Sequence, residues 1–543
     1  MTSLVPRPPY SNEELRSLYP ATLELQLVHI LLRHGERTPI SARFQNTGLP
    51  AFWPYCTAVR QLKSAVLDRT TGQFTTLEWK RRLESFGPGD EPVLAVGPRG
   101  ELDGICEMGM LTDRGRETTF DLGTRLRKLY VDQLAFLPPT LRDADSFYLR
   151  ASPIPRALES LQETFTGLYP PHTRSPSFPP PTILQRTLSE ETLFPNDSSC
   201  RRFAALARAF AQRAAGRWNE TDEMEYLNKL FGKWMPPASH RVAVDGRPRL
   251  SGIQDTVNAA LAHGPDTQLP KEFYDRKGRE IMETITVDEW FTGYKESQEY
   301  RMLGVGALLG DVVGRMVGSA EHSSADGGYE TKRPRSKEQL EGDKGDAPVQ
   351  KFGLSGCHDT TLAGVLASLG AFEGDKWPPF TSHIAIELFR KNDVASETPS
   401  ATPNVLQATI SPAESQGQND NVTGSNSGAG WFASVFSWVP SFGGRTAAGT
   451  PPPGIGRKPV AQLEPHEKAQ LQDYYVRLRY NDEVVTVPGC RAPGKHLEGN
   501  ESFCTLEAFK AIVDKFVPRD WKQQCSTNVK GPAFPASPEP AGY

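Results

Sequence analysis

The sequence predicts an α/β protein in which a mainly parallel sheet is flanked by helices and carries a helical cap insertion. Aliphatic runs of strand length alternate with stretches of helical spacing, which is the pattern of parallel strands joined by crossover helices. The middle of the chain loses the strand signal and becomes helical. At 543 residues, the chain is long enough for two or three domains around one sizeable core.

The first strand and helix pairs lie before residue 171. Residues 23–32 (LELQLVHILL) predict a buried strand. Residues 112–130 place apolar side chains at near-helical spacing behind Thr112, a good N-cap residue. Residues 147–149 predict a second strand, and residues 155–168 predict a helix that ends at Pro170.

Beyond this point the pattern changes twice. Residues 171–318 are dominated by helical stretches, which predicts the cap. Residues 319–350 are polar and nearly free of large apolar side chains, so we expect disorder there. A strand at 351–354 and a helix at 360–369 then resume the α/β pattern.

The last strands predict an antiparallel hairpin with a long excursion at its tip. Residues 384–389 and 474–480 are strand-like, and residues 391–472 between them are largely of low complexity. Closure entropy grows only logarithmically with loop length, so such an insert is tolerated. The sequence thus predicts an irregular N-terminal arm at residues 1–22 and an α/β domain in three pieces at 23–170, 351–390 and 473–530. The helical cap is expected at 171–318, and the two inserts at 319–350 and 391–472.

Composition excludes several classes of protein. The chain has 61 Lys+Arg against 65 Asp+Glu and a formal net charge of -4, without the basic stripe of a nucleic-acid binder. No run approaches the roughly 18 apolar residues of a membrane span. The N-terminus lacks the apolar stretch of a secretory signal peptide. We therefore expect an intracellular protein, cytoplasmic or mitochondrial.

Basic and acidic residues follow three of the predicted strands. They are Arg33, His34 and Arg37 after the first strand, Arg150 at the end of the second, and His358 with Asp359 after the third. Ligands in open α/β sheets sit outside the carboxyl ends of the strands, so we expect these side chains to meet in one crevice. Helix N-termini nearby favour an anion in that crevice.

This set of side chains suits a phosphate monoester. The three guanidinium groups offer forked hydrogen bonds to phosphoryl oxygens and lower the pKa of His34. The neutral imidazole can then attack phosphorus and form a phosphohistidine. His358 is a further donor to the phosphoryl group, and Asp359 protonates the leaving alcohol before it activates water. We expect no metal ion or other cofactor, because the histidines show no metal-ligand spacing.

Two motifs resemble those of a known family. LLRHGERTPI is similar to the R-H-G-x-R-x-P signature of the histidine acid phosphatases, and GCHDTTLAGVL is similar to their H-D motif. Further blocks, among them FYLRASPIPRALES and DKWPPFTSHIAIELF, extend the resemblance from about residue 23 to 525, apart from the two inserts. The lysophosphatidic acid phosphatase branch is the most similar.

The resemblance implies a phosphoglycerate-mutase-like fold with a helical cap. It implies lysophosphatidate or another small phosphate monoester as substrate. The site residues it implies are His34 as nucleophile, Asp359 as proton donor, and Arg33, Arg37, Arg150 and His358 as phosphate ligands.

Two alternatives stay open. The first is a mutase or sugar-bisphosphatase of the same superfamily; that branch takes its acid from a glutamate elsewhere, so the His358–Asp359 pair counts against it. The second is an inactive relative that serves as a membrane-tethered binding module. The intact set of site residues counts against the second alternative.

An aromatic island interrupts the second insert at residues 431–442. Trp431, Phe432, Phe436 and Trp438 lie at or beside helical spacing. This pattern predicts a short interfacial helix that contacts a membrane, or a segment that packs on the body or binds a partner protein. Because no basic residue flanks the island before Arg445, the second interpretation is favoured.

Seven cysteines in a chain of this length do not predict a disulfide framework. The resemblance places Cys490 and Cys504 where relatives carry two nearby cysteines that can close a small loop. In a reducing compartment they would stay thiols. Cys357, beside His358, is either a buried structural residue, which is favoured, or a reactive thiol in a cationic pocket.

Overall fold

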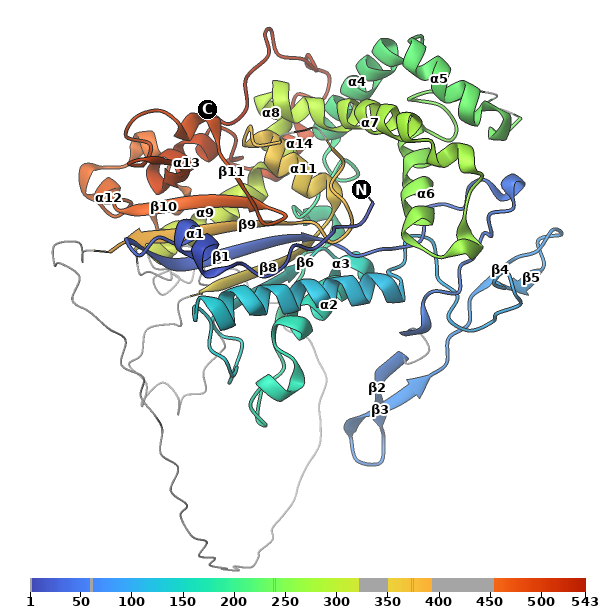
Figure 1. Cartoon of the computed structure of the whole chain (residues 1–543), viewed down its shortest axis with the longest axis horizontal. Helices are drawn as coiled ribbons and strands as arrows, with labels where there is room; N and C mark the ends of the chain where they lie inside the picture. The colour runs from blue at the N-terminus through green and yellow to red at the C-terminus, as the bar shows by residue number, and fades with distance from the viewer. Residues whose placement is uncertain are drawn as a thin grey trace, which may run out of the picture. The chain divides into compact units, whose positions relative to one another are not determined.

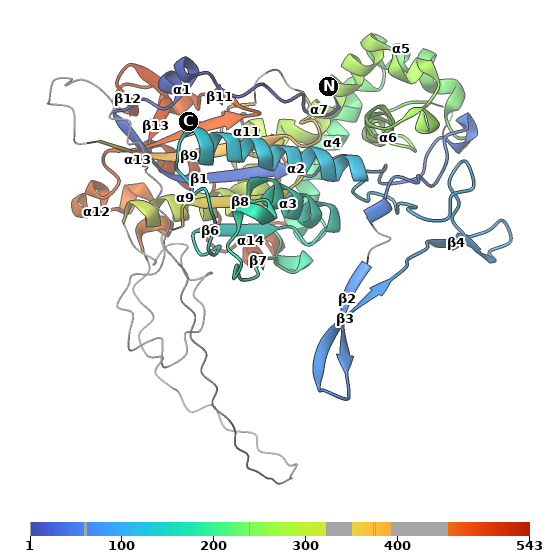
Figure 2. The same ribbon diagram turned by 60° about the horizontal axis from the view of Figure 1, so that its bottom comes forward.

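The computed structural model describes residues 2–321, 350–392 and 454–543, apart from residues 59–61, 238, 240, 373 and 375. A nine-stranded sheet lies at the centre of the described residues, in the order β12-β13-β10-β9-β1-β8-β6-β7, with β11 beside β10. Figure 2 shows β9, β1, β8 and β6 in this arrangement. The strands are β1 (Leu23–Arg33), β6 (Phe147–Ala151), β7 (Ile183–Leu184), β8 (Phe352–Cys357), β9 (His383–Lys391), β10 (Tyr474–Tyr480), β11 (Glu483–Val485), β12 (His496–Leu497) and β13 (Asn500–Thr505).

Strand pairing confirms the α/β class. β1 pairs in parallel with β8, β8 with β6, and β6 with β7, so their carboxyl ends share one edge of the sheet. On the other side of β1 the pairing is antiparallel, first with β9 and then between β9 and β10. The predicted antiparallel hairpin is therefore confirmed, with Ile386 opposite Leu478.

Helices cover both faces of the sheet (Figure 1). Leu27 and Leu31 of β1 face the core that includes α9, α11 and α13, whereas Val28, Ile30 and Leu32 face α2 and α3. Because both faces of the strand are covered, residues 27–32 of β1 are apolar except His29. The helices of these layers are α2 (Asp113–Arg127), α3 (Pro155–Leu168), α9 (Ala307–Ala320), α11 (Asp359–Ser368) and α13 (Leu506–Asp514).

The helices expected from local signals form where the sequence predicts them. Thr112 caps α2 through its side chain, which accepts the backbone N–H of Gly115. Helix α3 begins at Pro155, whose fixed φ suits the first helical position.

Residues 201–320 form a helical region. The cap expected at 171–318 does not begin at its first residues, because 171–200 hold short turns and β7, which joins the central sheet beside β6. Helices α5, α6 and α7 enclose a separate apolar core together with Phe44 and Trp53. The stretch Gln298–Ala320 is long and apolar enough to cross a membrane by length and composition, but 83% of its most apolar window is buried inside the protein. It therefore serves this fold as a core helix. The further helices are α4 (Arg201–Trp218), α5 (Asp222–Phe231), α6 (Leu250–Ala262), α7 (Arg276–Glu296) and α8 (Gln298–Arg301).

Several elements differ from expectation. The N-terminal arm is not wholly irregular, because Ser11 and Glu14 form a capping box that starts α1 (Asn12–Leu18). Residues 454–472, predicted as low-complexity insert, pack on the core because Ile455, Val460 and Leu463 are apolar and buried. The other elements are β2 (Leu62–Asp68), β3 (Gln73–Trp79), β4 (Glu84–Phe86), β5 (Pro92–Leu94), α12 (Pro465–Ala469) and α14 (Trp521–Ser526).

Two predictions lie outside the described residues. Most of the first insert, at 322–349, is not among them. The aromatic island with Trp431, Phe432, Phe436 and Trp438 is not among them either.

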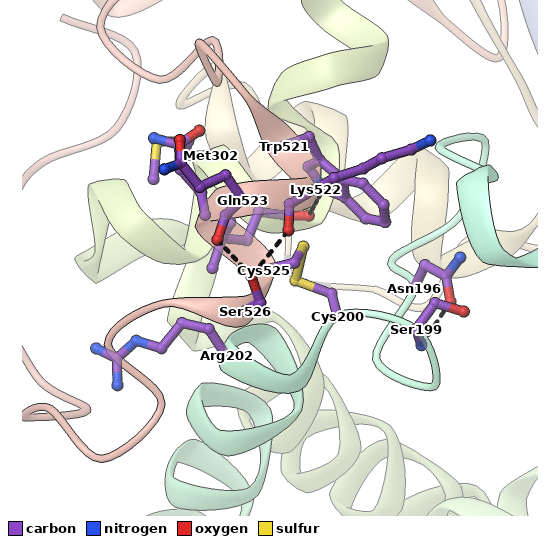
Figure 3. The surroundings of a disulfide bond; sticks show 12 residues. Asn196, Ser199, Cys200, Arg202, Met302, Trp521, Lys522, Gln523, Cys525 and Ser526 are labelled. Carbon is purple, nitrogen blue, oxygen red and sulfur yellow. Dashed lines mark hydrogen bonds between the residues drawn. A yellow bond between two sulfur atoms is a disulfide. The ribbon is translucent and has the colours of Figure 1, made fainter.

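The expectation of no disulfide framework is wrong. Three disulfides join Cys56 to Cys106, Cys200 to Cys525, and Cys490 to Cys504. Figure 3 shows Cys200, at the start of α4, bonded to Cys525 on α14. The fold brings these two cysteines together across 325 residues, a proximity that spacing in the sequence does not reveal.

The remaining thiol is that of Cys357. It is fully buried, and burial raises the pKa of the Cys357 thiol far above its usual range. Cys357 is therefore a structural residue without thiolate character, as the favoured interpretation had it.

Candidate active site

The turn after β1 carries His34 and holds it against α2. The backbone N–H of Gly35 donates to Ser160 Oγ at 3.1 Å. A Cβ atom at Gly35 would lie 2.2 Å from the carbonyl oxygen of Gly115, in the first turn of α2. Only glycine permits this approach, so the turn that follows His34 packs directly on the backbone of α2.

One hydrogen bond sets the tautomer of His34. Its Nδ1 atom lies 2.9 Å from the carbonyl oxygen of Gly35, and a carbonyl can only accept, so Nδ1 carries the proton. Burial, and then the charges of Arg156, Arg37 and Arg33, hold the pKa of His34 well below its usual range. Its imidazole is therefore neutral, and the lone pair of Nε2 is free.

Five arginines line the same cavity as His34, namely Arg33, Arg37, Arg43, Arg156 and Arg249. Three of them, Arg33, Arg37 and Arg156, are those whose charges lower the pKa of His34. Arg33 donates to the Pro378 carbonyl oxygen and lies with its Cζ 4.1 Å from the centroid of the Phe380 ring. Arg37 pairs with Asp255 of α6 at 2.8 Å. Arg156, in the first turn of α3, donates to the carbonyl oxygen of Gly109 at 3.3 Å, and burial together with Arg37 lowers its pKa to about 10.

His358 and Asp359 enter the cavity from the start of α11. The ring centroids of His358 and His34 lie 5.5 Å apart, and His358 Nε2 lies 2.8 Å from Ser152 Oγ. Burial, and then Arg156, lower the pKa of His358 to about 3. Burial acts to raise the pKa of Asp359, but Arg33 and Arg37 outweigh it and hold that pKa at about 2.

The structure corrects the prediction for Arg150. This residue is buried, bonds Glu191 Oε1 at 2.6 Å and Thr192 Oγ1 at 3.2 Å, and does not line the cavity. Arg150 lies within β6 rather than after it, and neighbouring strand residues face opposite sides of the sheet. Since Leu149 faces the α2 and α3 side, Arg150 faces Asp311 of α9, at 3.7 Å.

Arg156 is the site residue that sequence reasoning missed. A signal for it exists, because Pro155 marks the first position of a helix that starts directly after the carboxyl end of β6. Side chains in such a first turn lie at the edge of the sheet where ligands bind. The structure thus brings together five of the six predicted residues and adds Arg156.

Glu36, inside the signature motif, faces away from the cavity. It is fully buried, and its Oε2 accepts a hydrogen bond from Thr118 Oγ1 at 2.5 Å. Its negative charge therefore does not oppose an anion through direct contact.

The cavity has a volume of about 420 Å³ and a mixed lining. Apolar and aromatic side chains share its lining with the charged groups, namely Ile40, Ile154, Phe194, Trp290, Trp377 and Phe380. Among the described residues, no group of three or more His, Cys, Asp or Glu side chains is placed to hold a metal ion.

A neutral imidazole among guanidinium groups at the carboxyl edge of an α/β sheet defines a class of protein, the phosphate monoester hydrolases with a histidine after the first strand. Residues 24–401 match the model of the histidine phosphatase superfamily (branch 2), and the chain belongs to this family. It is a phosphomonoester hydrolase.

Two proteins of similar sequence agree with this assignment. A probable acid phosphatase of Schizosaccharomyces pombe is 33% identical over 93% of this chain and 95% of its own length. Lysophosphatidic acid phosphatase type 6 of Homo sapiens is 25% identical over 68% of this chain and 74% of its own length. Among solved structures, a Hafnia alvei phytase aligns with a TM-score of 0.47 and 12% identity, covering 93% of this chain and 99% of its own.

Proposed function

We propose that the protein hydrolyses phosphate monoesters through a phosphohistidine on His34. Nε2 forms a bond to phosphorus while the bond from phosphorus to the ester oxygen breaks, and the leaving alcohol takes a proton from Asp359. Water then attacks the phosphohistidine and gives its proton to Asp359, which releases phosphate and restores His34. The observation that carries this proposal is the Nδ1 hydrogen bond to Gly35, because it directs a free Nε2 lone pair into the cavity.

Electrostatics support the assigned roles. Arg33, Arg37 and Arg156 supply the positive charge that a transferring phosphoryl group requires. Before substrate arrives, Asp359 pairs with Arg33 at 2.8 Å. A phosphate dianion competes for Arg33 and adds negative charge, and both effects raise the pKa of Asp359 toward the protonated form that a general acid needs.

The cavity supports a substrate with an apolar group. We propose lysophosphatidate or a related small monoester, because apolar side chains such as Ile154, Phe194 and Trp290 line the cavity together with the guanidiniums. The lysophosphatidic acid phosphatases among the similar proteins support the same substrate class. A kinetic screen of lysophosphatidate, sugar phosphates and inositol phosphates tests it, and a preference for sugar bisphosphates would favour the mutase-like alternative instead.

Hydrolysis of p-nitrophenyl phosphate at acid pH tests the mechanism. Wild type should turn over and His34→Ala should not, since the nucleophile is lost. Acid quench of the wild type with labelled substrate should trap a phosphoenzyme that the variant lacks. Full activity in His34→Ala would refute the assignment, and no turnover in wild type would support the alternative of an inactive binding module.

We infer an oxidising compartment for the folded chain, which disfavours the cytoplasmic half of the cytoplasmic or mitochondrial location expected from the sequence. Six of the seven cysteines are paired, and disulfides persist in oxidising compartments but are rare where thiols are kept reduced. Fractionation of the native source, followed by gel electrophoresis with and without reductant, tests this location.

Membrane contact through the aromatic island stays a prediction. Co-sedimentation with liposomes of lysophosphatidate and phosphatidylcholine compares wild type with a deletion of residues 428–444. Equal amounts of the two proteins in the liposome pellet would contradict membrane contact through the aromatic island.

A further inference from the structure

Trp377 connects the proposed proton donor to α7, a helix of the 201–320 region. Its indole Nε1 donates to Asp359 Oδ2 at 3.0 Å, and its backbone N–H donates to Glu283 Oε1 of α7 at 3.0 Å. Its ring lies against two aromatic residues of the same helix, with centroids 5.0 Å from Phe291 and 6.1 Å from Trp290. Trp377 is therefore fixed at both its backbone and its ring.

The carboxylate of Asp359 has little freedom to rotate. Its Oδ1 accepts the backbone N–H of Thr360 at 2.8 Å, and its Oδ2 accepts from Arg33 Nη2 at 2.8 Å as well as from Trp377. Of the two Oδ2 partners, Arg33 is also a proposed phosphate ligand, so its bond to Asp359 weakens when a phosphate binds. The indole of Trp377 has no such competing role.

Trp377 suits this task chemically. An indole N–H donates but does not accept, and it does not titrate, so it holds a carboxyl oxygen without exchanging a proton with it. The ring contacts on α7 fix the direction of that N–H. General acid catalysis depends on such a fixed direction, since the acid must meet the leaving oxygen in the transition state.

We propose that Trp377 is a positioning residue that orients the Asp359 carboxyl toward the leaving-group oxygen and ties this orientation to α7. The proposal rests on the role of Asp359 as proton donor in the proposed function. It gives α7 an influence on the chemical step in addition to its part in the cavity wall.

The test compares two leaving groups in Trp377→Phe, which keeps an aromatic ring at this position and removes the N–H together with the fused five-membered ring. The quantity is kcat/KM, which reports steps up to departure of the alcohol. p-Nitrophenolate leaves with little protonation, whereas an alkoxide such as that of glycerol 2-phosphate needs the acid. We expect about tenfold loss for glycerol 2-phosphate and less than about twofold loss for p-nitrophenyl phosphate.

Trp521→Phe is the matched control. The indole Nε1 of Trp521 donates to the Leu303 carbonyl oxygen at 3.0 Å, and Trp521 does not line the cavity. The same substitution there should leave both values of kcat/KM as in wild type. An equal loss on both substrates in Trp377→Phe, or no loss on either, would overturn the proposal.

Two further variants keep the result decisive. Glu283→Ala removes the acceptor of the Trp377 backbone N–H without touching the indole. It should lower kcat/KM for glycerol 2-phosphate by about threefold and leave kcat/KM for p-nitrophenyl phosphate nearly unchanged. This variant tests the proposal even if Trp377→Phe folds poorly. Asp359→Asn separates the two proposals. If it shows no selectivity between leaving groups, the proposed function fails; if it shows selectivity and the Trp377 and Glu283 variants do not, only the present inference fails.

Discussion

Arg37 Nη2 lies 2.8 Å from Asp255 Oδ1, so a guanidinium from the turn after β1 is held by a carboxylate from α6. Asp255 Oδ2 also accepts the backbone N–H of Ile40 at 3.0 Å and pairs with Arg43 at 3.5 Å. One carboxylate of the helical region thus fixes the loop that carries a proposed phosphate ligand. The helical region contributes in this way to the geometry of the anion site.

The first prediction concerns this contact. Asp255→Ala should raise KM for p-nitrophenyl phosphate by about tenfold, because Arg37 loses the partner that orients it. Asp255→Asn keeps an acceptor at the same position and should raise KM less than about threefold. Steady-state kinetics check both values. An equal rise in the two variants would contradict the role of orientation and show that the negative charge of Asp255 determines KM.

The second prediction separates Arg156 from Arg150. Arg156→Ala should lower kcat/KM by about 10²-fold, since a donor to the transferring phosphoryl group is lost. Arg150→Ala should lower the free energy of unfolding by about 3 kcal/mol, because it leaves Glu191 buried without its partner. Its kcat/KM, measured on folded protein, should stay within about threefold of wild type.

Kinetics and denaturant unfolding of the two variants are read together. The opposite result would be a strong loss of kcat/KM in folded Arg150→Ala and a nearly normal kcat/KM in Arg156→Ala. It would support Arg150 as the phosphate ligand, as the sequence predicts, and contradict that role for Arg156.

The third prediction concerns stability at acid pH without substrate. Burial lowers the pKa of His29 and of His358 to about 3, against about 6.5 in the unfolded chain, and lowers that of His34 as well. Between these pH values the unfolded chain binds more protons than the folded chain. The free energy of unfolding is therefore at its full value above about pH 6.5 and declines as pH falls toward 3. Asp359, with a pKa of about 2 against 3.8, adds a decline below about pH 4.

Denaturant unfolding at pH 7, 6 and 5 measures this loss. His29→Gln, a change on β1 away from the cavity lining, should reduce the slope with pH because the contribution of one buried histidine disappears. A free energy of unfolding that does not change between pH 7 and pH 5 would contradict the assignment of neutral buried histidines.

The fourth prediction counts thiols. Protein purified without reductant and unfolded in guanidinium should react with one equivalent of Ellman's reagent, from Cys357, and with seven after reduction. The native protein should react with none, because Cys357 is buried. Three or more thiols before reduction would mean that at least one of the disulfides is not formed.

The pattern of residues within short segments of the sequence was enough to predict much of this molecule. The apolar run at 23–32 and the basic residues directly after it specify a strand end with Arg33 and His34, because both features lie within a few residues of each other. The same holds for His358 and Asp359, which stand between β8 and the start of α11. Strand identity, helix start and chemistry are properties of short segments, so the sequence alone determined them.

Tertiary structure decided everything that depends on direction or on distant contacts. Arg150 and Arg156 are six residues apart in one motif, yet only the packing of β6 between two helical layers shows that Arg150 points to α9 while Arg156 lines the cavity. Three further contacts likewise join separate segments of the chain: the hydrogen bond from Trp377 to Asp359, the ion pair of Arg37 with Asp255, and the disulfide between Cys200 and Cys525. The physical reason is that a side chain's partners are set by the face it occupies and by which helices bury that face, and neither is encoded within a single segment.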